Sequence, residues 1–144
     1  MTPRSPAKGS MGHPDRKAIL AKVADLVGRR PEIVFAYAHG SFIGEDAFRD
    51  VDIAVWVDPR FLPGQDPVDY EIGLSLLLER EVHVPVDVKR LNEAPLGFRY
   101  HASRGLLIRC RDDEARTAWI EQVRDLYWDF EPVARRHLHE VLYG

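Results

Sequence analysis

Two short runs of alternating apolar residues constrain the fold of this chain more than any other feature of its sequence. Residues 51–57 place Val51, Ile53, Val55 and Val57 at every second position, and residues 82–88 do the same with Val82, Val84, Val86 and Val88. Successive side chains of a strand point to opposite faces, so each run predicts a strand with one apolar face. Two further β-prone runs, residues 33–38 and 105–110, raise the number of expected strands to about four.

Helical patterns separate these runs. Apolar residues recur at helical spacing from Pro14 onward, and Pro31 ends that first helix. A second helical pattern follows the proline-rich loop 59–67, and a long C-terminal helix is expected to begin near Asp112, a suitable N-cap, and to be interrupted at Pro132. The alternation of helices and strands predicts an α/β domain in which helices pack on a small sheet.

The chain has 144 residues, of which 45% are hydrophobic and 30% charged, as in an ordinary globular domain with one core. Residues 1–13 lack any periodicity and are expected to be a disordered tail, which leaves 14–144 as the domain. A net charge of -3 argues against strong nucleic-acid binding. With Cys110 as the single cysteine, no signal-like start and no long apolar run, we expect a cytoplasmic protein without a membrane partner.

Acidic residues gather on the polar sides of the two alternating runs. Asp50 and Asp52 would project from one face of a strand, about 7 Å apart along it. Asp87 occupies the face of run 82–88 that the valines do not, and neighbouring strands would bring all three carboxylates together. Magnesium prefers oxygen ligands and is commonly shared with substrate phosphates, and paired sites hold two ions. The sequence therefore predicts a magnesium site that binds a nucleoside triphosphate.

Gly40 and Ser41 follow the first strand run directly. A glycine there lets the backbone approach a phosphate, and the serine offers a hydroxyl and an amide, more so if residues 41–46 begin a short helix. Arg49 could reach the same phosphates, or it could equally be an exposed charge. Alone, a Gly-Ser turn or an Asp-x-Asp pair is more often a plain turn or cap, and a lone strand aspartate can protect a sheet edge. Their order and spacing favour one combined site.

Three further side chains leave two interpretations open. His39 precedes the Gly-Ser turn and is more often a structural histidine than a catalytic one. His83 would share the face of Asp87, which gives it a weak claim to the site. Trp128 lies off the apolar stripe of the last helix, so it could be exposed and contact a partner.

The spacing of Gly40-Ser41, eight residues, then Asp50-Val51-Asp52 resembles the signature of the polymerase-β-like nucleotidyltransferase superfamily. In its small size the chain is similar to the minimal nucleotidyltransferase antitoxins that accompany HEPN ribonuclease toxins, over about residues 14–132. The gap of eight residues is shorter than the ten usual in those antitoxins, and Glu45 and Asp46 make the loop less basic. The resemblance implies a small mixed sheet of about four strands flanked by helices.

It also implies a magnesium-dependent transfer of AMP from ATP to a hydroxyl, with pyrophosphate leaving. In the antitoxins the acceptor is a tyrosine of the cognate HEPN toxin. By the resemblance, Asp50 and Asp52 would bind two Mg²⁺ ions, Asp87 would bind one of them and help activate the acceptor, and Gly40 and Ser41 would hold the triphosphate. Two alternatives remain: an antitoxin that acts by contact alone, and an enzyme with a small-molecule acceptor, as in the aminoglycoside nucleotidyltransferases.

Overall fold

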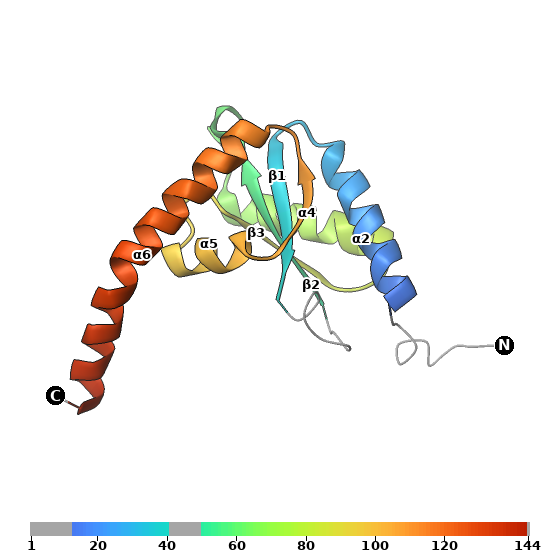
Figure 1. The fold of residues 1–144 in the computed structure, drawn as a ribbon. Helices are drawn as coiled ribbons and strands as arrows, with labels where there is room; N and C mark the ends of the chain where they lie inside the picture. Colours follow the sequence, from blue (N-terminus) through green and yellow to red (C-terminus); the bar gives the residue numbers. More distant parts are fainter. Residues whose placement is uncertain (1–12, 41–49, 144) are drawn as a thin grey trace.

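The computed structural model describes residues 13–40 and 50–143 of the chain (Figure 1). The expected tail lies outside the described residues except for His13, the first residue of a helix. No helix in the described ranges is both long and apolar enough to cross a membrane. In chain order the elements are α2 (His13–Gly28), β1 (Ile33–His39), β2 (Val51–Val57), the 3-10 helix η1 (Pro59–Phe61), α4 (Pro67–Val82), β3 (Val86–Arg90), α5 (Leu96–Ser103), β4 (Leu106–Cys110) and α6 (Asp113–Tyr143).

The four strands form one mixed sheet in the order β3-β2-β1-β4. Strand β1 is antiparallel to both β2 and β4, whereas β2 and β3 are parallel. A parallel pair needs a crossover connection, and α4 supplies it between β2 and β3. This arrangement confirms the predicted α/β fold with a small mixed sheet flanked by helices.

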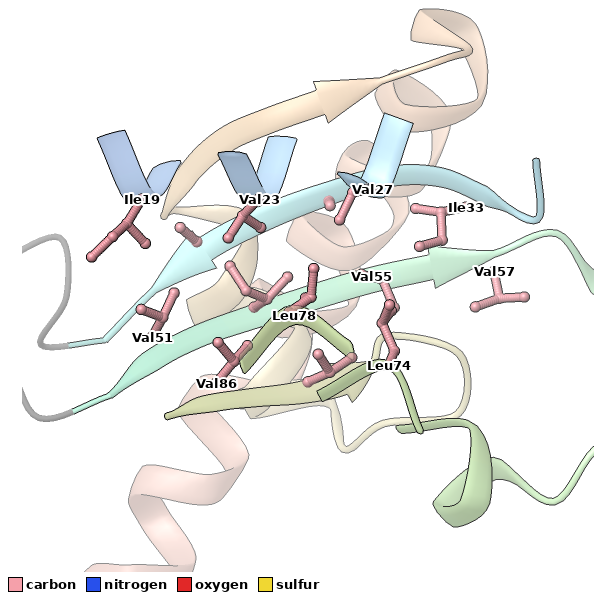
Figure 2. Packing of buried hydrophobic residues seen from close by; sticks show 14 residues of the cluster. Ile19, Val23, Val27, Ile33, Val51, Val55, Val57, Leu74, Leu78 and Val86 are labelled. Atoms are coloured by element: carbon pink, nitrogen blue, oxygen red, sulfur yellow. The ribbon is translucent and has the colours of Figure 1, made fainter. Parts of the chain in front are cut away.

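The valine face of the sheet forms the larger part of the core (Figure 2). Val51, Ile53 and Val55 of β2 are fully buried there, and they pack with residues of two helices that cover this face. Helix α2 contributes Ile19, Val23 and Val27, and helix α4 contributes Leu74 and Leu78. The predicted apolar face of β2 is confirmed. Because this face is buried, the alternate residues of β2 must project from the opposite face of the sheet.

The opposite face of the sheet is aromatic and is covered by α5 and α6. Phe35 and Tyr37 of β1 pack there with Trp119 of α6, and the rings of Phe35 and Trp119 lie 5.2 Å apart. Trp56 lies at the end of β2 that is distant from Asp52. Its ring stacks on that of Phe35, and the two ring centroids are 6.1 Å apart. The aromatic residues thus fill one end of this face, while the beginnings of β2 and β3 carry polar side chains.

Helix α4 protects the outer edge of β3. The backbone N–H groups of Val86, Val88 and Arg90 point away from β2 and donate to the side chains of Glu79, Ser75 and Glu71, over 3.0, 3.0 and 2.8 Å. These three acceptors stand four residues apart, so they lie along one face of the helix. An edge strand whose donors are occupied in this way is a poor template for an added strand.

The third strand differs from the prediction at its start. Helix α4 continues through Val82, and β3 begins only at Val86, because the apolar stripe of Leu74 and Leu78 extends to Val82. His83 ends the helix in a left-handed conformation (φ 62°), and its N–H donates to the Glu79 carbonyl over 2.8 Å. His83 is therefore a helix cap, and the prediction that it shares a strand face with Asp87 is wrong.

The predicted interruption at Pro132 is also wrong, because α6 runs unbroken from Asp113 to Tyr143. Pro132 is exposed, so the carbonyl that loses its helical donor can bond to water. The predicted N-cap is confirmed, since the Asp112 carboxylate accepts the Ala115 N–H over 3.1 Å. Trp128 is 61% exposed. The C-terminal part of α6 extends past the sheet (Figure 1).

Candidate functional site

The structure brings the predicted aspartates to one end of the sheet. Asp52 of β2 and Asp87 of β3 are register partners in adjacent parallel strands, which are spaced about 4.8 Å apart. Their neighbours Val51, Ile53, Val86 and Val88 enter the valine core, so both carboxylates project from the opposite face. Asp50 lies just before β2, two residues from Asp52. The predicted cluster required β2 and β3 to be neighbours in the sheet, and the structure shows that they are.

The charge on this cluster is unfavourable in the protein alone. Burial raises the pKa of Asp52 above its ordinary value, and the neighbouring carboxylates of Asp50 and Asp87 raise it further. The repulsion shows that the three groups lie within electrostatic reach of one another. A bound cation would relieve it, so the ionic state of the site favours a divalent metal.

The carboxylates do not form a closed metal cage. Among residues 13–40 and 50–143, no three His, Cys, Asp or Glu side chains are grouped as a preformed metal site requires. Magnesium seldom needs such a cage, because it keeps several waters and binds through one or two carboxylates together with substrate phosphates. The donor set fits an ion that arrives with a nucleotide.

Gly40 places the end of β1 directly over Asp52. Its φ of +78° lies in the left-handed region, and a Cβ at this position would stand 2.5 Å from Asp52 Oδ2. Backbone and carboxylate are therefore packed as closely as only a glycine permits. Ser41, Arg49 and the short helix expected at 41–46 lie outside the described residues.

His39 belongs to the wall of the same site. It is the register partner of Asp52 in the β1–β2 pair, and its ring meets that of Phe98 edge-on at 5.3 Å. Burial lowers the pKa of His39, an effect that the charge of Asp87 partly opposes. Its Nε2 is buried without a hydrogen-bond partner among the described residues. The sequence favoured a structural role for His39, which was not among the predicted site residues.

A groove that sequence reasoning missed runs along β3 beside Asp87. Its first part, about 380 Å³, lies between α4 and β3 and is lined by Asp87 together with Val68, Ile72 and Leu76. A second part, about 400 Å³, is lined by Pro95 and Phe98 among others, and the two parts share Glu71 and Lys89. The available signal was a second apolar stripe in α4, offset from the buried Leu74 and Leu78.

A family comparison agrees with this geometry. Residues 21–114 match the family model described as Polymerase beta, Nucleotidyltransferase. The matched span is more than half of the chain and contains Gly40 and the aspartates at 50, 52 and 87. The chain belongs to the polymerase beta nucleotidyltransferase family.

Solved structures of the same fold come from toxin–antitoxin complexes. One is a tri-AMPylated Shewanella oneidensis HEPN toxin in complex with MNT antitoxin, where the matched chain is 16% identical, 88% of this chain and 98% of that chain are covered, and the TM-score is 0.68. A toxin–antitoxin MntA-HepT structure gives 15% identity, the same coverage and a TM-score of 0.68. A toxin–antitoxin structure with AMP-PNP gives 16% identity, coverage of 85% and 98%, and a TM-score of 0.69.

A sequence search of curated proteins finds no significant match. At 15–16% identity the solved structures establish a common fold with this chain. Nearly the whole length of each matched chain is covered, so the shared fold extends beyond the span of the family model.

Proposed function

We propose that this chain is a magnesium-dependent nucleotidyltransferase that moves AMP from ATP to a tyrosine of a HEPN toxin and thereby acts as an antitoxin in the cytoplasm. The observation that carries the proposal is the register pairing of Asp52 with Asp87 beneath Gly40. Membership of the nucleotidyltransferase family supports the reaction class. The AMPylated toxin and the AMP-PNP in structures of the same fold support the acceptor and the donor.

In this proposal Asp50, Asp52 and Asp87 hold two Mg²⁺ ions, and Gly40, Ser41 and Arg49 bind the triphosphate. The ions would neutralise the negative charge of the phosphates and would offset the mutual repulsion of the carboxylates. Gly40 keeps the chain close enough for backbone groups to face a phosphate. Asp87, on the outermost strand, is the carboxylate most open to an acceptor, because its side chain is exposed whereas that of Asp52 is half-buried.

The transfer forms a bond between the tyrosine oxygen and the α-phosphorus of ATP, and it breaks the bond from that phosphorus to the bridging oxygen of the leaving pyrophosphate. The tyrosine proton passes to a carboxylate oxygen of Asp87 in our assignment, and from there to solvent. The position of Asp87 beside Asp52 allows one cluster to serve both the donor and the acceptor.

The test incubates this protein with ATP, magnesium and the purified product of the neighbouring gene, which in our proposal is the HEPN-type toxin. The toxin should gain the mass of AMP on a tyrosine and lose its ribonuclease activity. The variant Asp50→Ala/Asp52→Ala should produce neither change, whereas Asp125→Ala, which alters an exposed aspartate of α6, should behave as the wild type. If the toxin is silenced without any gain of mass, the contact-only mechanism is correct and the catalytic proposal is wrong.

A further inference from the structure

We infer that the groove between α4 and β3 is the docking surface for the protein that carries the acceptor hydroxyl. This inference rests on the proposed function. The groove's apolar wall is the α4 strip formed by Val68, Ile72 and Leu76, which are 58%, 53% and 59% exposed. At four-residue spacing these side chains project from one side of the helix and extend over about 12 Å. An aligned apolar strip of this kind marks a contact surface more strongly than scattered single residues do.

The groove is continuous with the carboxylate site. Asp87 lines the same cavity as the α4 strip, and it shares a sheet face with Asp52. Glu71 and Lys89 line both parts of the groove, and the second part reaches Phe98, whose ring contacts His39. A protein seated on the strip could therefore present a hydroxyl to Asp87 from the open edge of the sheet. A small-molecule acceptor would contact only part of an apolar strip of this length.

The hydrogen bonds along β3 restrict how the acceptor protein can bind. Since the N–H groups of Val86, Val88 and Arg90 already donate to side chains of α4, no added strand can use them. The partner must dock through side chains, and the four-residue spacing of the α4 strip suits the face of a helix. Helix α4 is well placed for this role because it packs against β3, which is the outermost strand of the sheet.

Ile72→Asp tests the groove, because Ile72 is exposed and lies outside both core clusters. Val141→Asp is the matched control, an equally apolar exposed residue near the end of α6. With the toxin that we propose as the partner, Ile72→Asp should raise the KM for the toxin at least about tenfold, as expected for a lost aliphatic contact. Stabilisation of the variant by Mg²⁺ and ATP should equal that of the wild type.

An unchanged KM in Ile72→Asp, or equal losses in Ile72→Asp and Val141→Asp, would overturn the docking surface while leaving the transfer reaction standing. Failure of the wild type to transfer AMP would refute the proposed function instead. In that case the dissociation constant of the toxin complex still tests whether the toxin docks in the groove. Ile72→Asp should weaken the complex at least about tenfold and Val141→Asp should not, and the opposite pattern would reject the groove.

Discussion

Replacing Gly40 by alanine should leave the protein folded but abolish its stabilisation by Mg²⁺ and ATP. The added Cβ would stand 2.5 Å from Asp52 Oδ2, and contacts under 3.0 Å are essentially never observed, so the carboxylate must retreat by at least 0.5 Å. Metal–ligand distances tolerate only about 0.2 Å. Alanine at φ +78° also costs about 1–2 kcal/mol of backbone strain, which lowers the Tm of a domain of this size by roughly 2–8 °C.

The chain provides a matched control in Gly64, whose φ is +81° but whose added Cβ would meet nothing within 4 Å. Thermal unfolding of both variants, with and without Mg²⁺ and ATP, is the assay. Both should lose similar stability, and only Gly40→Ala should lose the gain from ligand, which is about 2.7 kcal/mol at a hundred times Kd. If Gly40→Ala keeps the full gain, or Gly64→Ala loses it as well, Gly40 does not act through Asp52.

Three further outcomes follow from the carboxylates and from the edge of β3. Asp52→Asn should raise the stability of the metal-free protein by roughly 0.5–1 kcal/mol at pH 7, because it removes a like charge opposite Asp87, and it should abolish stabilisation by Mg²⁺ and ATP in thermal unfolding. Because the pKa of Asp52 is raised above 3.8 in the folded protein, folding favours the protonated carboxyl. The stability gained from this protonation is complete below pH 3.8 and is lost as the pH rises through the folded-state pKa. Urea unfolding should therefore show the advantage of Asp52→Asn growing above about pH 4, and a constant difference would contradict the shift. Ser75→Ala should cost about 0.5–1.5 kcal/mol in urea unfolding, because the part-buried bond from the Val88 N–H to Ser75 Oγ is lost, and a loss near zero would mean that this bond does not stabilise the fold.

The sequence predicted those parts of the fold that depend on local periodicity. Alternation at Val51, Ile53 and Val55 sufficed to place one face of β2 in the core and Asp52 on the other. The same rule failed at Val82 and Val84, because Val82 stands four residues after Leu78 and continues the helical stripe instead. Competition between the two periods was decided by Leu74 and Leu78, which already pack in the core, and by the left-handed cap at His83.

The site was predictable only as far as strand faces determine it. Asp52 and Asp87 could be assigned to polar faces from their neighbours, but their direct pairing depends on the parallel register of β2 and β3. The crowding between Gly40 and the Asp52 carboxylate depends on a third strand. The role of α4 in capping β3 arises from packing between distant segments. The strip of Val68, Ile72 and Leu76 follows a local apolar stripe of α4, but its place beside Asp87 depends on the fold.

The central claim is that the site transfers the α-phosphoryl group of ATP with its nucleoside. The measurement compares ATP labelled at the α-phosphate with ATP labelled at the γ-phosphate, each incubated with the wild type, magnesium and the toxin that we propose as its partner. We predict label on the toxin from α-labelled ATP only, release of pyrophosphate, and no label with Asp50→Ala/Asp52→Ala. Label from the γ-phosphate, or equal α-label with the double variant, would contradict it.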